Sequence, residues 1–407
     1  MRWSFGVIVA ATILCACQEK LTSPADCPAL CPGGTPQVFD TVLTAVAGAD
    51  STYTGYVQAH QAAAMPVTNG LEGFEQRGLV RFLARGDSVT LRDTLRGYTI
   101  DSVALSFALV TRDTTTTGLD LLLYRVGPGF DSTTTYTDVA PAFVPESLVA
   151  VVPIADTVNS GILRTVLQGT DLSKVQLSPA DSGNLAIGLR LSAPTFTGVR
   201  IGALAGNSSP VFTTYATLDV PDTGTAKLRN IALTAGANTT VSEAPPLVID
   251  TTLLAVGGAP SSRSLIRFDL PPRIRDSATI VRATIELTPV APIIGLPNTN
   301  GSDTLPTAVV AKPLLADVGA KSPVSIDPRR IPKDTLDVGA TGVSLEAVRL
   351  VELWIGFAPR PSSIMLSLEP EASSFSHPVF YSSRALDPAL RPRLRLSYLL
   401  RFPFEGP

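Results

Sequence analysis

The sequence predicts an all-β protein made of two tandem jelly-roll-like β-sandwich domains, which follow a lipoprotein signal peptide and a short tether. Short runs rich in Val, Ile, Leu, Thr and Phe recur between clusters of Gly, Pro, Asn and Asp, a pattern typical of β-sandwiches. Apolar and polar residues alternate within runs such as 103–107 and 280–287, so one face of each strand can be buried. An internal repeat gives the number of domains.

Residues 1–16 have the layout of a secretory signal peptide. A single Arg precedes an apolar run over residues 5–14, which is too short to span a bilayer as a helix. The run ends in Leu14-Cys15-Ala16-Cys17, which resembles a bacterial lipobox, where a peptidase cuts before a cysteine that then carries lipid. We therefore expect Cys17 to be a lipidated N-terminus. Cleavage of an ordinary signal peptide near Ala16 is the alternative.

The lipid would place the chain in the cell envelope, and Gln18 after the cysteine favours the outer membrane of a diderm bacterium. No later apolar stretch reaches transmembrane length, so we expect the lipid to be the only membrane anchor. Residues 17–37 are the expected Pro-rich tether. Within it, Cys27 and Cys31 are close enough to form a disulfide in an oxidising compartment. Free or intermolecular thiols and a metal site are the alternatives, and the metal site lacks nearby histidines.

The rest of the chain reads as a duplication, which assigns one domain to residues 38–222, a second to 223–400 and a tail to 401–407. Similar segments recur in the same order with offsets between about 175 and 190 residues, as loop-length drift between two copies would produce. The paired segments are 42–45 with 232–235, 78–82 with 264–268, 98–107 with 278–287, 185–191 with 361–368, and 215–220 with 393–398. One short helix is expected around residues 345–354.

The second copy contains Ser264-Leu265-Ile266-Arg267-Phe268-Asp269-Leu270-Pro271, then Ala278-Thr279-Ile280-Val281-Arg282-Ala283-Thr284-Ile285-Glu286-Leu287, a segment around Trp354 and a last strand over 392–398. This order resembles the DNRLRE-type domains, β-sandwiches of bacterial surface and secreted proteins that are related to carbohydrate-binding modules. The first copy matches more weakly, with Arg81-Phe82-Leu83-Ala84 in place of Arg-Phe-Asp-Leu and no tryptophan. The matching residues are framework positions, so the resemblance implies a fold, and a binding role only by analogy.

Composition and chemistry exclude several classes of function. Hydrophobic residues make up 45% of the chain and charged residues 16%, which excludes a disordered protein. A net charge of −3 does not suit a nucleic-acid partner. The histidines, His60 and His377, accompany no nucleophile motif, and no spacing singles out a catalytic carboxylate pair. We therefore expect a protein that is not an enzyme and has no catalytic residues.

Aromatic side chains in loop-like sequence are the candidate ligand-binding residues, because aromatic faces stack on sugar rings. The residues selected are Tyr53, Tyr56, Phe130 and Tyr136. For each of them, packing in a sandwich core is the alternative, and Trp354 is expected in the core.

No cofactor or metal site is expected. A structural calcium ion is the alternative, because β-sandwich modules often hold one. The candidate ligands are aspartates at expected strand ends, namely Asp40, Asp50, Asp250 and Asp269. No Asp-x-Asp-x-Asp-Gly loop occurs, so aspartates that cap turns are the favoured interpretation.

The expected function is non-catalytic binding, and the expected partner is a polysaccharide. Two linked modules would bind a repeating polymer more tightly than either module alone. The alternative is a structural or adhesive scaffold that binds other envelope proteins. A concave groove with exposed aromatic residues would favour the first function, and flat polar faces with an open sheet edge would favour the second.

Overall fold

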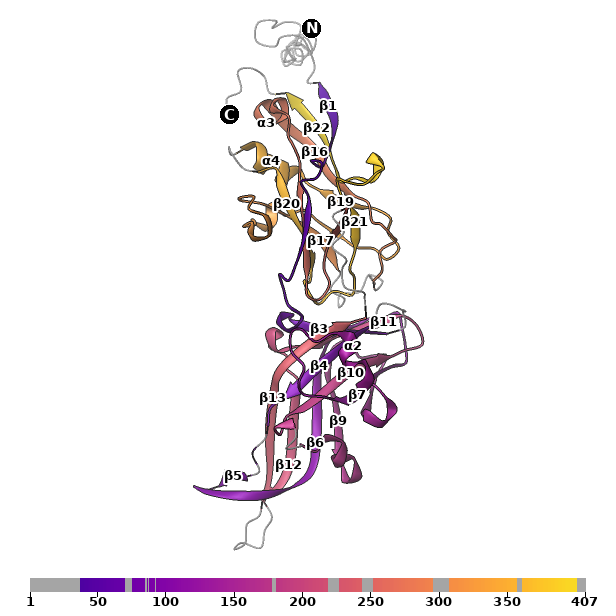
Figure 1. Cartoon of the computed structure of the whole chain (residues 1–407), viewed down its shortest axis with the longest axis vertical. Helices are drawn as coiled ribbons and strands as arrows, with labels where there is room; N and C mark the ends of the chain where they lie inside the picture. Colours follow the sequence, from indigo (N-terminus) through magenta and orange to yellow (C-terminus); the bar gives the residue numbers. More distant parts are fainter. Residues whose placement is uncertain are drawn as a thin grey trace, which may run out of the picture.

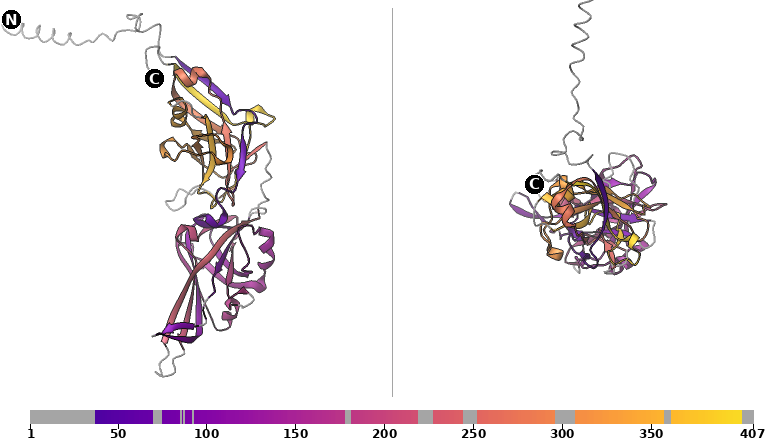
Figure 2. Two further views of the ribbon diagram at one scale, coloured as in Figure 1. Left: turned by 60° about the vertical axis from the view of Figure 1, so that its left-hand side comes forward. Right: turned by 90° about the horizontal axis from the view of Figure 1, so that it is seen from above.

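The computed structural model describes residues 37–69, 75–84, 86, 88–91, 93–177, 181–218, 227–243, 252–295, 307–356 and 361–400. These residues form an all-β fold of antiparallel sheets, which confirms the predicted fold class, and the sheets build two lobes along the long axis (Figures 1 and 2). Cys17, Cys27 and Cys31 lie outside the described residues. No described helix is long and apolar enough to cross a membrane.

Lobe A, the lower lobe in Figure 1, contains β3 to β13. Its strands follow the order β3-β11-β6-β12-β13-β4-β10-β7-β8, with β5 and β9 paired to β6. The strands are β3 (Ala64–Asn69), β4 (Gln76–Phe82), β5 (Ser88–Leu91), β6 (Thr94–Arg112), β7 (Leu119–Val126), β8 (Leu148–Ile154), β9 (Gly161–Gln168), β10 (Leu185–Ser192), β11 (Thr197–Gly202), β12 (Val211–Leu218) and β13 (Lys227–Ser242).

Lobe B, the upper lobe, contains β14 to β22 together with β1 and β2 from the other end of the chain (Figure 1). Its sheets have the orders β1-β22-β16-β19, β18-β17-β20-β15-β2 and β14-β21. The strands are β1 (Val38–Thr44), β2 (Ser51–Thr54), β14 (Leu253–Ala255), β15 (Ser262–Arg267), β16 (Ala278–Leu287), β17 (Ala308–Pro313), β18 (Lys333–Thr335), β19 (Val343–Glu346), β20 (Ser363–Glu369), β21 (Val379–Tyr381) and β22 (Arg393–Leu400).

Helices are short in both lobes. The α-helices are α2 (Tyr136–Val139), α3 (Pro272–Ser277) and α4 (Val348–Gly356), and 3₁₀ turns connect several strands. The expected helix around residues 345–354 corresponds to α4. Its Trp354 is 3% exposed and packs against Phe268, in the core of lobe B as expected.

The two lobes have the same strand connectivity. β6 lies between β12 and β9 as β16 lies between β22 and β19, and β4 pairs with β10 as β15 pairs with β20. The register agrees as well, because Phe212 faces Leu105 as Leu394 faces Ile285, and a bulge follows at the corresponding place in each lobe. A duplicated sequence accounts for this agreement.

The last pair of repeated segments has a different register from the one expected. The cross-strand partners of β12 and β22 align residues 211–218 with 393–400, whereas sequence similarity aligned 215–220 with 393–398. Alternating strands tolerate a slip of an even number of residues without changing which face is apolar, so similarity alone does not fix the register.

The strand that opens each sequence copy lies in the other copy's lobe. β1 pairs with β22 and β2 pairs with β15, so residues 38–54 complete lobe B. β13 pairs with β12 and β4, so residues 227–242 complete lobe A. The lobes therefore differ from the predicted domains 38–222 and 223–400 by a reciprocal strand exchange. Sequence similarity matched 42–45 with 232–235, but it could not assign either strand to a lobe.

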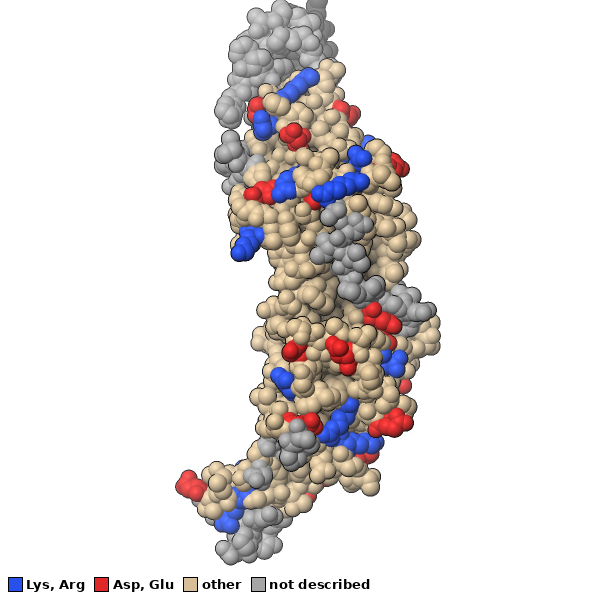
Figure 3. Space-filling model, viewed as in Figure 1, with Lys and Arg blue, Asp and Glu red and all other residues tan. Residues whose placement is uncertain are grey.

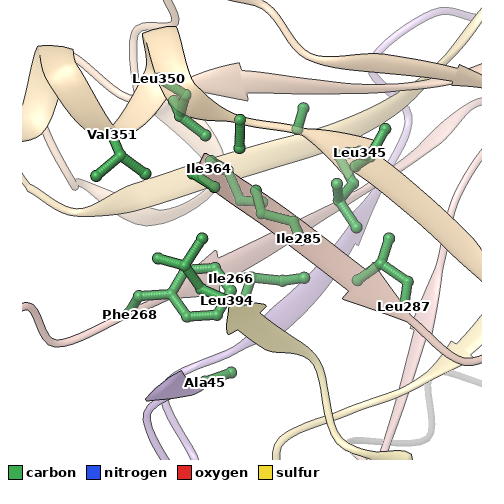
Figure 4. Close-up of a cluster of buried hydrophobic side chains, with 14 of the residues drawn as sticks. Ala45, Ile266, Phe268, Ile285, Leu287, Leu345, Leu350, Val351, Ile364 and Leu394 are labelled. Atoms are coloured by element: carbon green, nitrogen blue, oxygen red, sulfur yellow. The ribbon is translucent and has the colours of Figure 1, made fainter. Parts of the chain in front are cut away.

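The exchanged residues take part in the core of lobe B. Ala45 is 5% exposed, forms a β-bridge with Phe268 and lies in the same apolar cluster as Ile266 and Leu394 (Figure 4). Figure 4 shows its side chain on the N-terminal strand at the edge of this cluster. Lobe B thus depends on apolar contacts with a segment that lies more than 200 residues away in the sequence.

A buried polar contact marks the corresponding point in each exchanged strand. The Asp50 carboxylate, 1% exposed, accepts hydrogen bonds from the Ser383 backbone N–H at 2.5 Å and from its hydroxyl at 2.7 Å. In lobe A, the Asn238 side-chain oxygen accepts a hydrogen bond from the Leu204 N–H at 3.0 Å. The two residues hold corresponding positions. Asp50 directly precedes the residue that pairs with Leu265 of β15, and Asn238 directly precedes the residue that pairs with Leu79 of β4. Each exchanged strand is therefore held by the same kind of contact.

Asp50→Ala should lower the free energy of unfolding of lobe B by about 2–3 kcal/mol, because it leaves the buried Ser383 N–H without its acceptor. Asp50→Asn is the matched control and should cost much less, since asparagine does this work at position 238. Urea unfolding, followed by the fluorescence of the buried Trp354 of lobe B, measures the free energy of unfolding of both variants. Equal effects of the two substitutions would contradict the proposed role of Asp50.

Candidate binding site between the lobes

A cavity of about 680 Å³ lies where the two lobes meet. This volume falls within the roughly 300–1,000 Å³ of typical small-molecule sites. Lobe A contributes Gln76 and residues 132–137 and 239–243, and lobe B contributes residues 258–260, Ser262, Ser376 and His377. Thr54, Gln58 and Ala59 complete the wall where the chain passes from β2 into lobe A.

The strand exchange builds this cavity. The chain crosses from one lobe to the other after each exchanged strand, and the ends of both strands, Thr54 of β2 and Ser242 of β13, line the cavity. Arg200 of β11 holds the lobes together at the same boundary. Its Nε donates a hydrogen bond to the Ser373 carbonyl at 2.9 Å, and its guanidinium lies 4.6 Å from the centroid of the Phe375 ring. The wall is therefore fixed from both sides.

The loop over residues 131–138 is held by its own threonine and aspartate side chains. Thr133 donates hydrogen bonds from its backbone N–H and its hydroxyl to the Asp131 carboxylate, both at 2.7 Å. Thr135 binds the Asp138 carboxylate in the same way at 2.8 and 2.6 Å. The hydrogen bonds from the threonine hydroxyls have the largest effect and those from the backbone N–H groups the next largest. Together they hold the pKa of the Asp131 and Asp138 carboxyls below the ordinary value. The loop therefore presents a fixed wall to the cavity.

Tyr136 is the aromatic side chain of the cavity wall. Its hydroxyl donates a hydrogen bond to the Glu75 carboxylate at 2.8 Å, and the Arg77 guanidinium lies 4.3 Å from its ring centroid. Burial and the hydrogen bond to Glu75 raise the pKa of Tyr136 to about 12. The ring remains partly exposed and cannot turn without losing these contacts.

Glu75 is the anchor beneath Tyr136. Its carboxylate also accepts two hydrogen bonds from Arg77 at 3.0 Å and one from Arg190 at 2.8 Å. Burial would raise the pKa of Glu75, but the hydrogen bonds from Arg77 and Tyr136 and the charges of Arg77 and Arg190 hold it below its ordinary value. The charge is therefore compensated inside the protein, and Tyr136 is held by an ionised acceptor.

Several lining side chains have hydrogen-bonding atoms that the protein does not use. Among the described residues, nine buried side-chain atoms have no hydrogen-bond partner, and more than half of them belong to this wall. They are Gln76 Oε1, Thr240 Oγ1, Ser262 Oγ, Ser376 Oγ and His377 Nε2. An unpaired buried polar group costs about 1–3 kcal/mol, so such a cluster needs a reason. These atoms are shielded from solvent as well, so they lie behind the accessible surface of the cavity.

His377 is packed against a glycine that cannot readily be replaced. Gly258 has a φ of +82°, and a Cβ there would lie 3.2 Å from His377 Nε2. Burial lowers the pKa of His377 to about 4, so the imidazole is neutral near pH 7. A neutral imidazole can both donate and accept a hydrogen bond.

The structure separates the aromatic residues selected from the sequence. Tyr136 lines the cavity, but Phe130 is 6% exposed and packs in an apolar cluster of lobe A, so it is not available to a ligand. Tyr53 and Tyr56 lie on lobe B, because their segment is exchanged, and they pack against Leu265 and its neighbours. The Tyr56 hydroxyl donates a hydrogen bond to the Ala320 carbonyl at 2.5 Å. These four residues therefore do not form one binding platform.

The other residues of the wall could not be predicted from sequence motifs. Gln76, Thr240, Ser262 and Ser376 belong to separate segments and to no motif, and His377 was considered as a catalytic base or metal ligand but not as a binding residue. Only the exchanged arrangement of the strands brings them to one place.

Two of the four aspartates considered for calcium accept hydrogen bonds from serine residues, and a third, Asp269, is exposed. Asp40 accepts a hydrogen bond from the Ser397 hydroxyl at 2.5 Å, and Asp50 binds Ser383. Asp250 lies outside the described residues. Within the part of the chain that the structure describes, no group of three His, Cys, Asp or Glu residues could hold a metal ion.

Charges of both signs are scattered over both lobes on the face shown in Figure 3, and no broad area there carries a single sign.

Comparison with protein-family models and with curated proteins finds no match for this chain. No relative therefore carries a function over to it.

The neutral His377 predicts a loss of stability in acid. Its pKa of about 4 in the folded protein lies below the ordinary value of about 6.5, so the unfolded chain binds the proton first as pH falls. Stability should therefore decline between about pH 6.5 and 4, by up to about 3 kcal/mol. His377→Asn should remove this part of the pH dependence, and His60→Asn, at an exposed position, should not. Urea unfolding at pH 7 and 4.5 measures this pH dependence of stability. An unchanged pH dependence in His377→Asn would contradict the lowered pKa of His377.

Proposed function

We propose that the chain is a lipid-anchored cell-envelope protein that binds a polysaccharide, without catalysis, in the cavity between its lobes. The supporting observation is the lining, in which residues with hydroxyl, amide and imidazole side chains surround one fixed aromatic ring, Tyr136. Sugar rings are recognised by this combination, since the aromatic face contacts the ring and the polar groups fix its orientation.

The charges of the wall favour a neutral glycan. Among the described lining residues there is no Lys or Arg, and Glu243 is the one carboxylate. An anionic sugar would therefore find no cation and would meet a like charge. Arg77, beneath Tyr136, is bound to Glu75 and already has its counter-ion.

The same lining supports binding rather than hydrolysis. Glycosidases generally use two carboxyl groups on opposite sides of the scissile bond, and Glu243 has no second carboxylate among the described residues of the wall. A site with one carboxylate and many hydroxyls suits retention of a polymer better than its cleavage.

The N-terminal sequence supports the place of action. A lipid on Cys17 would hold the protein at the outer membrane, and the tether over residues 17–37 leads into β1 of lobe B. The cavity and lobe A lie on the side of lobe B away from the start of β1 (Figure 1). A polymer outside the membrane could reach the cavity there.

The strand exchange supports a second candidate, a scaffold that spaces or binds other envelope proteins. Two chain crossings and the contact of Arg200 with Ser373 and Phe375 join the lobes, which suits an elongated spacer. This function needs no ligand in the cavity, so a binding experiment separates the two candidates.

An array of bacterial, algal and plant polysaccharides, probed with residues 18–407 without lipid and with or without calcium, tests the proposal. We expect saturable binding to a neutral polymer, weakened at least about tenfold by Tyr136→Ala because the aromatic contact is lost. Tyr136→Phe should retain most of the affinity, because the ring remains.

Tyr215→Ala is the matched control for this experiment. Tyr215 lies on β12 in contact with Arg164, away from the cavity lining, and its loss should leave binding unchanged. No binding across the array, or equal loss with both alanine variants, would overturn the glycan proposal and leave the scaffold.

A further inference from the structure

Residues 38–54 form the covalent path from the tether to lobe A. Val38 faces Leu399 near the end of β22, and Thr54 faces Ser262 beside the cavity. Residues 55–57 still form hydrogen bonds with Ser261 of lobe B, and after Val57 the chain passes into lobe A (Figures 1 and 2). A pull on the tether therefore reaches lobe A without running through residues 252–400, which make up the rest of lobe B.

Most of this path is already extended, except for a turn at residues 46–49, where the Ala49 N–H donates a hydrogen bond to the Val46 carbonyl. A residue in a strand spans about 3.3 Å, against a maximum of about 3.6 Å in a stretched chain. If β1 and β2 separated from lobe B and the turn opened, the path between Val38 and Thr54 would lengthen by only about 1 nm. Tension along it therefore does little work that could unfold lobe B.

Lobe B holds the path in place along its length. β1 pairs with β22 over residues 38–44, and β2 pairs with β15 over residues 51–54. Between them, Asp50 binds Ser383, and Arg267 donates a hydrogen bond to the Ala49 carbonyl. These contacts keep the segment extended when there is no load.

We propose that residues 38–54 act as a strap that carries tension from the membrane tether directly to lobe A, so that lobe B is bypassed mechanically. Lobe B would then remain folded while a load on lobe A pulls against the anchor. This proposal needs attachment through the N-terminal tether, and it is independent of what the cavity binds.

The same register gives the opposite behaviour when the two chain ends are pulled apart. Val38 and Leu399 are neighbours at one end of an antiparallel pair, so a pull between the termini separates β1 from β22 one pair at a time. The hydrogen bonds lie across the strands and break in succession, not together. The two pulling directions should therefore differ sharply.

Single-molecule stretching in optical tweezers tests the strap, on a chain in which Cys17, Cys27 and Cys31 are serine. One protein carries handles at Gln37→Cys and His60→Cys, on either side of the strap, and the second carries them at Gln37→Cys and Pro407→Cys. Ala63→Cys is an alternative to His60→Cys, because both positions are exposed just after β2. Trp354 fluorescence confirms beforehand that lobe B is folded.

In the second protein we expect a low-force step of about 50 nm as residues 252–400 unfold, at roughly 3.5 Å per residue. The first protein should show no step longer than about 2 nm, because only about 8 nm of chain lies between its handles and most of it is already extended. Asp50→Ala should lower the force of the step in the second protein and leave the first unchanged. A step of several nanometres in the first protein, which would show that the strap was not extended, or equal forces in both directions, would overturn the proposal.

Discussion

Each lobe has a gap between two strands that only a segment from the other sequence copy fills. In lobe B the gap lies beside β22 and β15, and β1 and β2 fill it. In lobe A, β13 fills the corresponding gap between β12 and β4. An empty gap would leave unpaired backbone groups and expose the apolar cluster around Phe268. The strand exchange is therefore the constraint on which the fold, the cavity and the strap all depend.

The exchange gives the molecule properties that two separate sandwiches would lack. The chain crosses between the lobes twice, and the cavity forms at those crossings with Tyr136 on one side and His377 on the other. The tether leads into lobe B, while the strap that starts there ends at lobe A. Ligand binding and mechanical attachment would thus meet at one boundary, where the contact of Arg200 with Phe375 also holds the lobes.

Much of the fold could be predicted because local patterns determine it. Alternation of apolar residues located β6 and β16, and similarity located β4 and β15 as counterparts. The lobe of each exchanged strand could not be predicted, because two similar strands fit two similar gaps. The loop before Tyr136 could be predicted from its threonines and aspartates. For Phe130 the sequence left binding and core packing open, and only the structure shows that it packs with Val126 and Phe143. The remaining lining residues come from distant segments and needed the structure.

Deletion of residues 18–54 tests the strand exchange most directly, with the fluorescence of Trp354 and the cooperativity of urea unfolding as readouts. If β1 and β2 complete lobe B, the deleted chain should show solvent-exposed Trp354 and lose the unfolding transition of lobe B. A synthetic peptide of residues 38–54 should restore both, and a scrambled peptide should not. A deleted chain with native Trp354 emission and an unchanged transition would show that lobe B does not need the exchanged strand, and would contradict the exchange.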